Sequence, residues 1–169
     1  MRRLLYSVLL ITSTLFSSSK FNELNSEQLK KIAKTVTDVN IDQNDRTLIA
    51  AIGWQESDFD KKIAFKKTSW SGYFQLSPKS VKRRNPHISM TDISYRLRYD
   101  WSFMTKESQA EINYWRDYFK KKNNNSLIPV LAAYNNGFAW KRPKSMKYAN
   151  EVISKKNYLD SLVRQGLFN

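Results

Sequence analysis

The sequence predicts a single, mainly α-helical domain with at most a small β-hairpin. Apolar residues recur at helical spacing in most segments, and residues that start or stop helices separate these segments. The chain has 169 residues, which is enough for one domain with a hydrophobic core. It contains no internal repeat and no long linker, so we expect residues 20–169 to form one domain.

Two helices are expected in the first third of the chain. Asn25 or Ser26 can cap the first, because short polar side chains accept hydrogen bonds from free helical N–H groups. Its predicted buried stripe consists of Leu29, Ile32, Ala33 and Val36. The second helix is expected over 45–56. Residues 57–71 show no regular pattern, and residues 72–76 are predicted to form a turn or a short extended piece.

The rest of the chain is also expected to be helical. Ser77 and Pro78 form a good helix start, because proline is favoured at the first helical position. Ser126 can cap a later helix, and Gly137 is expected to end it. After the helix that begins at Pro78, helices are expected over residues 92–104, 106–122, 127–136, 148–154 and 158–165.

The composition excludes several kinds of chemistry. The chain has no cysteine, so disulfides and thiolate metal sites are excluded. His87 is the only histidine and lies in a turn-like setting, which removes paired-histidine metal sites and argues against Ser-His-Asp catalysis. The chemistry must therefore come from carboxylates, hydroxyls and amides, and we expect no metal and no cofactor.

The first 19 residues are typical of a signal peptide. Arg2 and Arg3 precede an apolar stretch over 4–16, and the serines at 17–19 offer small residues for cleavage before Lys20. The apolar stretch is shorter than the about 20 residues of a membrane span. We therefore expect cleavage rather than an uncleaved anchor, no stable membrane span afterwards, and an exported protein of the periplasm or cell envelope.

The chain is strongly basic. Its 29 Lys and Arg residues exceed its 15 Asp and Glu residues, which gives a net charge of +14 and attracts polyanions. For an exported protein, the acidic cell wall or an anionic membrane surface is a more sensible partner than nucleic acid. The sequence has no helix-turn-helix signature, RNP-like sequence or zinc knuckle, so no nucleic-acid partner is expected.

Glu56 is the leading candidate for a catalytic residue. Leu48, Ile52 and Glu56 are four residues apart, so they share one helical face, and this face should point inward. Burial and the negative end of the helix dipole should both raise the pKa of Glu56. A carboxyl that keeps its proton near neutral pH can act as a general acid. An isolated Glu at a helix end is more commonly solvated, so other residues must support this interpretation.

Four short motifs in a fixed order supply that support. They are Ile52–Phe59, Ser71–Pro78, Leu131–Gly137 and the pair Tyr148 and Val152. In this order they resemble the Glu-Ser, Gly-Leu-Met-Gln-Leu-x-Pro, Ala-Ala-Tyr-Asn-x-Gly and Tyr-x-x-x-Val motifs of the soluble lytic transglycosylases. The resemblance covers about residues 45–153. It departs from the family pattern at Tyr73 and Phe74, where the family has Leu-Met.

The resemblance implies a lysozyme-like fold with a deep saccharide cleft. It also implies cleavage of the β-1,4 bond between N-acetylmuramic acid and N-acetylglucosamine in peptidoglycan, with formation of a 1,6-anhydro ring and no cofactor. Glu56 matches the single catalytic acid, and Ser57 matches a serine that orients the acid or contacts the muramoyl group. The other matching residues, which bind substrate or position the acid, are Gln75, Tyr134, Asn135 and Tyr148.

Aromatic side chains are further candidates to line the cleft, although core packing is expected for several of them. The candidates are Tyr73, Phe74, Trp54, Trp70 and Trp140.

Other functions remain open. If Asp58 or Asp60 reaches the cleft, it can hold a water for an inverting hydrolysis, as in a goose-type muramidase. A wall-binding or virion protein can also keep the fold without activity. Small exported transglycosylases serve secretion systems, conjugation, pili, phages or murein turnover, so a component of such a system is a candidate partner.

Overall fold

The computed structural model describes residues 24–60 and 72–168, and over these residues the fold is helical, with no β-strand. Its α-helices are α2 (Ser26–Val36), α3 (Arg46–Ser57), α5 (Pro78–Arg84), α6 (Met90–Tyr99), α7 (Trp101–Lys120), α8 (Leu127–Asn136) and α9 (Pro143–Arg164). Short 3₁₀ helices η1 (Gln43–Asp45) and η2 (Gly137–Ala139) precede α3 and follow α8. The predicted mainly α-helical fold is confirmed. The predicted signal peptide and Trp70 lie outside the described residues.

Helix α2 begins where the sequence predicts. The Asn25 side chain accepts hydrogen bonds from the backbone N–H groups of Glu27 and Gln28, and the Gln28 side chain accepts one from the Asn25 N–H. This reciprocal arrangement is a capping box, which satisfies N–H groups that the helix itself leaves free. Gln28 also donates to the backbone carbonyl of Asp58, 2.8 Å away, and so ties α2 to the end of α3.

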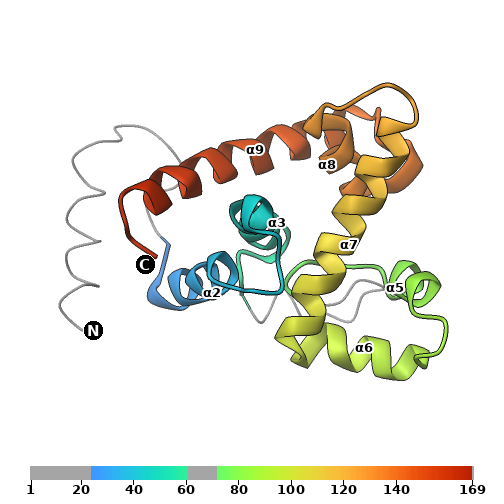
Figure 1. The fold of residues 1–169 in the computed structure, drawn as a ribbon, viewed down its shortest axis with the longest axis horizontal. Helices are drawn as coiled ribbons and strands as arrows, with labels where there is room; N and C mark the ends of the chain where they lie inside the picture. The colour runs from blue at the N-terminus through green and yellow to red at the C-terminus, as the bar shows by residue number, and fades with distance from the viewer. Residues whose placement is uncertain (1–23, 61–71, 169) are drawn as a thin grey trace.

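Helix α3 forms the centre of the domain, and Figure 1 shows it end-on between α2 and α9. All residues from Leu48 to Trp54 are buried. Gly53 permits the close approach of two aromatic rings, because a Cβ at this position would lie 2.6 Å from the Phe59 ring and 2.8 Å from the Phe74 ring. The rings of Phe59 and Phe74 pack edge to face against one another beside α3.

The region predicted as one helix over 92–104 consists of two helices. Asp100 separates α6 from α7, and its backbone is extended. Its side chain accepts a hydrogen bond from the Phe103 N–H at the start of α7. The same carboxylate pairs with Arg96 in the last turn of α6. Asp100 therefore serves both helix ends, because a carboxylate suits a helix N-terminus and a guanidinium suits a C-terminus.

The two final segments predicted near 148–154 and 158–165 are helical, but the predicted break between them is wrong, because α9 is one continuous helix of 22 residues. Its buried face continues through the polar residues in the middle, with Tyr148, Val152, Leu159 and Leu162 on one side. None of the described helices is both long enough and apolar enough to cross a membrane.

Candidate active site

Glu56 lies in the last turn of α3, on the face that carries Leu48 and Ile52. These two apolar side chains are fully buried, whereas Glu56 lines a cavity of about 400 Å³. Burial raises the pKa of Glu56 to about 7, against the opposing effects of a hydrogen bond from Tyr148 and the positive charge of Lys155. The predicted direction of the pKa shift is therefore confirmed, and Glu56 keeps its proton in mildly acidic solution.

Tyr148 holds the Glu56 carboxyl from a helix that packs directly against α3. Its Oη, on α9, donates a hydrogen bond of 2.6 Å to Oε1 of Glu56. Burial and the neighbouring Glu56 charge raise the pKa of Tyr148 well above its ordinary value, so the phenol stays protonated. Because Oε1 accepts this hydrogen bond, the proton of the neutral carboxyl resides on Oε2.

Ser57 lies next to Glu56 but does not line the cavity. Its side chain is buried, and Oγ lies 2.8 Å from the backbone carbonyl oxygen of Tyr73 and 3.1 Å from that of Gly53. Ser57 therefore joins the end of α3 to the turn over 72–75. This placement favours a positioning role over direct contact with a sugar.

The turn over 72–75 brings Gln75 to the cavity. Gln75 has φ 47°, an uncommon conformation for a residue other than glycine, and its Nε2 donates to the Gly72 carbonyl oxygen at 2.8 Å. Gly72 has φ 77°, and a Cβ there would lie 1.9 Å from the backbone oxygen of Leu97. Only glycine fits at position 72, because the turn lies directly against α6.

Tyr134 and Gln75 separate the Glu56 cavity from a second cavity of about 220 Å³ and line both. Oη of Tyr134 is 3.0 Å from the Phe74 carbonyl oxygen and 3.0 Å from Oγ of Ser108. Because a carbonyl only accepts, Tyr134 donates to Phe74 and accepts from Ser108. Asn135, the next residue of α8, also lines the Glu56 cavity.

None of the aromatic candidates within the described residues lines the Glu56 cavity. Phe74 is fully buried and Tyr73 is nearly so, and both rings pack against Phe59. Trp54 lines a different groove, of about 970 Å³, between α3 and α9, and Trp140 packs edge to face on a ring of α7. Large aromatic rings gain most from complete burial, which explains why the turn directs Gln75 to the cavity and its two predecessors to the core.

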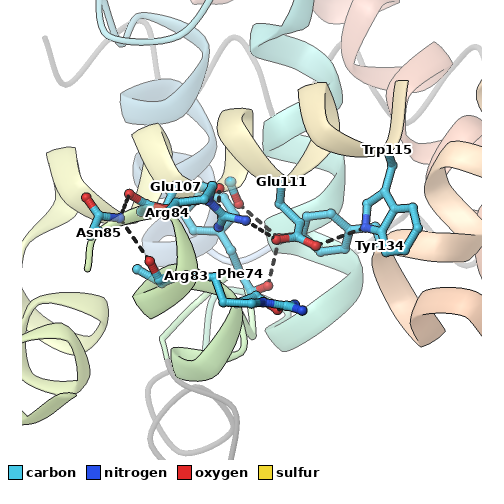
Figure 2. A network of polar contacts seen from close by, with 11 residues as sticks. Phe74, Arg83, Arg84, Asn85, Glu107, Glu111, Trp115 and Tyr134 are labelled. Carbon is cyan, nitrogen blue, oxygen red and sulfur yellow. Dashed lines mark hydrogen bonds and ion pairs between the residues drawn. The ribbon is translucent and has the colours of Figure 1, made fainter. Parts of the chain in front are cut away.

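A partly buried polar network beside the second cavity has no counterpart in the sequence prediction (Figure 2). Arg84 of α5 forms ion pairs with Glu107 and Glu111 of α7. Asn85 donates to Oε1 of Glu107 at 2.7 Å, and Trp115 donates to Oε1 of Glu111 at 2.9 Å. The network holds α5 against α7. No local pattern reveals it, because Arg84 is 23 residues from Glu107 and 27 from Glu111.

Three polar residues of the cavity were also missed: Asn136, Arg142 and Lys144. The first ends α8, and the other two flank Pro143 at the start of α9, where the sequence predicts no helix. A basic residue is so common in this chain that its type alone gives no signal.

Asp58 and Asp60 are exposed, and neither lines the Glu56 cavity. Asp58 has φ 49° as the C-cap of α3 and lines the groove that contains Trp54. Among the described residues that line the cavity, Glu56 is the one carboxyl. Within residues 24–60 and 72–168, no cluster of His, Asp or Glu side chains is placed to hold a metal ion.

Comparison with known proteins identifies the family of the chain. The profile of the Transglycosylase SLT domain matches residues 38–157, a span that includes Glu56, Gln75, Tyr134 and Tyr148. The chain is also 30% identical, over 138 residues, to the "Uncharacterized 20.7 kDa protein in vs-regB intergenic region" of Enterobacteria phage T4. The match covers 79% of this chain and 73% of the phage protein. No solved structure matches the chain significantly. The chain belongs to the transglycosylase SLT-domain family.

Proposed function

We propose that this protein is a peptidoglycan lytic transglycosylase with Glu56 as its single catalytic acid and base. The substrate bond is the β-1,4 linkage between N-acetylmuramic acid and N-acetylglucosamine. Family membership supports the reaction class and the substrate. The observation that carries the proposal is the Glu56 carboxyl, which lines a cavity and has a pKa of about 7. Its Oε1 accepts a hydrogen bond of 2.6 Å from Oη of Tyr148.

The first chemical step uses the proton on Oε2 of Glu56. Glu56 donates this proton to the glycosidic oxygen as the bond from that oxygen to the muramoyl C1 breaks. Positive charge then develops at C1, and the substrate's own N-acetyl group can stabilise it. The resulting Glu56 carboxylate keeps the hydrogen bond from Tyr148, which is stronger to a charged acceptor than to a neutral one.

The second step returns the proton. The Glu56 carboxylate takes the proton of the muramoyl C6 hydroxyl. At the same time the oxygen of this hydroxyl attacks C1 and closes a 1,6-anhydro ring. Glu56 ends in its starting state and no water is consumed, so one carboxyl suffices. An inverting hydrolysis would instead require a second group, on the opposite face of the sugar, that activates water. Asp58, the nearest sequence candidate for that role, lines the separate groove with Trp54, so the placement favours transglycosylation.

Peptidoglycan lies outside the cytoplasm, so we place the action of the protein in the periplasm or cell envelope. Export by a signal peptide over residues 1–19 stays a prediction. A secretion-system, pilus or phage component stays a candidate partner.

Muropeptide analysis tests the reaction directly. Purified murein is digested with the protein, and the released products are separated and identified by mass. We expect anhydro-muramoyl ends, which are lighter by one water than reducing ends. Glu56→Gln should release no product, whereas Asp58→Asn should behave as the wild type. Reducing ends from the wild type would establish a muramidase, and equal product from Glu56→Gln would exclude Glu56 as the acid.

A further inference from the structure

The cavity at Glu56 has an unbalanced charge. Arg142 and Lys144 both line it, and the one acidic residue among its described lining residues is Glu56 itself. The other lining residues are neutral amides and a phenol: Gln75, Tyr134, Asn135 and Asn136. Because Glu56 is protonated in mildly acidic solution, both positive charges are then left uncompensated.

The groove that contains Trp54 provides a useful contrast. It is also lined by two cations, Lys147 and Lys155, but Asp58 and Glu151 line it as well. Lys147 pairs with Glu151 at 3.9 Å. The excess of basic residues in the chain therefore does not by itself leave every hollow of the surface with an unmatched positive charge.

Arg142 and Lys144 have no carboxylate partner within the described part of the chain. The cation that lowers the pKa of Glu56 is Lys155, and neither Arg142 nor Lys144 has this role. Both side chains are exposed, but the backbone that carries them is held in place. Pro143 starts α9 between them, and the fully buried Ser145 accepts a hydrogen bond from Asn136 at 3.2 Å.

We propose that Arg142 and Lys144 bind a carboxylate of the substrate near the bond that is cleaved, so that the protein prefers anionic glycan strands to neutral ones. This inference rests on the proposed function and names the feature of the substrate that the site selects. The muramoyl residue can present a carboxylate in two ways. A strand without peptides carries the free lactyl carboxylate, and a strand with stem peptides carries the carboxylates of the peptide.

The test compares strands whose carboxylates are intact with strands whose carboxylates have been converted to neutral amides. Peptide-bearing strands and amidase-treated, peptide-free strands are prepared in both forms. Arg142→Gln and Lys144→Gln should each lower kcat/KM about tenfold on the anionic strands, as expected for the loss of one charge-assisted hydrogen bond. Neither substitution should change kcat/KM on the amidated strands. Lys147→Gln removes a cation that lines the Trp54 groove and should act as the wild type on every substrate.

The pattern of loss identifies the carboxylate. A loss on peptide-bearing strands alone assigns the peptide, and a loss on peptide-free strands assigns the lactyl group. Equal losses on anionic and amidated strands, or no loss on either, would overturn the inference.

A binding measurement separates this inference from the proposed function. Co-sedimentation of the Glu56→Gln protein with anionic strands should weaken about tenfold when either Arg142→Gln or Lys144→Gln is added. This readout needs no turnover, so it still tests the carboxylate site if the wild type proves to release no product. Unchanged co-sedimentation would contradict the site even in an active enzyme.

Discussion

Oη of Tyr148 and Oε1 of Glu56 lie 2.6 Å apart, although the two residues are 92 positions apart in the chain. This contact joins the end of α3 to α9 at the cavity. It also opposes the effect of burial, because a hydrogen bond to the charged form of a carboxyl lowers its pKa. The pKa of Glu56 is therefore set by a balance that substitutions can shift in a known direction.

Activity should depend on pH through Glu56. The protonated carboxyl is the acid of the first step, so kcat/KM should fall as pH rises above about 7, the pKa of this group. Tyr148→Phe removes the hydrogen bond that lowers this pKa, so the alkaline limb of the profile should move to higher pH while the maximal rate falls. Rates on soluble glycan strands between pH 5 and 9 check both effects. An alkaline limb that Tyr148→Phe leaves in place would show that another group controls it.

Stability should depend on pH through the same residue. The folded pKa of Glu56 is about 7 and its ordinary value is 4.5, so between these pH values the folded state holds a proton that the unfolded state has lost. The free energy of unfolding therefore decreases as pH rises across this window, by up to about 3 kcal/mol. Glu56→Gln cannot ionise, so it should be more stable than the wild type at pH 8 and similar to it at pH 4.

Urea unfolding at both pH values measures this difference. Glu151→Gln removes a carboxyl that lies exposed on α9 and serves as the control for the loss of one negative charge. A gain from Glu56→Gln that is the same at pH 4 and pH 8 would contradict the assignment of the elevated pKa.

Ser57→Ala should destabilise the domain and lower activity. It leaves the Tyr73 carbonyl oxygen without its 2.8 Å hydrogen bond in a buried setting, at a cost of about 1–2 kcal/mol. The turn that presents Gln75 then loses its attachment to α3. Ser126→Ala is a matched control, because Ser126 is exposed at the start of α8 and makes no side-chain capping bond. Equal unfolding midpoints for the two variants would contradict the anchoring role of Ser57.

Arg84→Met should be among the more damaging substitutions outside the cavity. It leaves the carboxylates of Glu107 and Glu111 largely buried without their cation, which costs about 3 kcal/mol or more. Arg83→Met is the control, because Arg83 is exposed and its one side-chain hydrogen bond within the described residues goes to Ser80. This substitution should change the free energy of unfolding by less than about 0.5 kcal/mol. Thermal unfolding of the two variants measures the contrast. Restoration of stability by adding Glu107→Gln and Glu111→Gln would identify the unpaired charges as the cause.

Local features of the chain were predictable because their signals act over a few residues. The Asn25 cap, the proline start of α5 and the Gly137 stop depend on backbone N–H groups and dihedral angles close by in sequence. The inward direction of Glu56 followed from its spacing to Leu48 and Ile52. The break at Asp100 was missed because the residues on both sides of it favour helix.

The sequence by itself determined a mainly helical fold, most of its helices and a carboxyl on the inward face at a helix end. Only the tertiary structure decided which groups meet that carboxyl. Arg142 and Lys144 line the cavity at the start of α9, Tyr148 contacts Glu56 from within α9, and the Arg84 network joins two helices. The physical reason is that periodicity assigns a residue to a face of its own helix, whereas its partners depend on how separate helices pack.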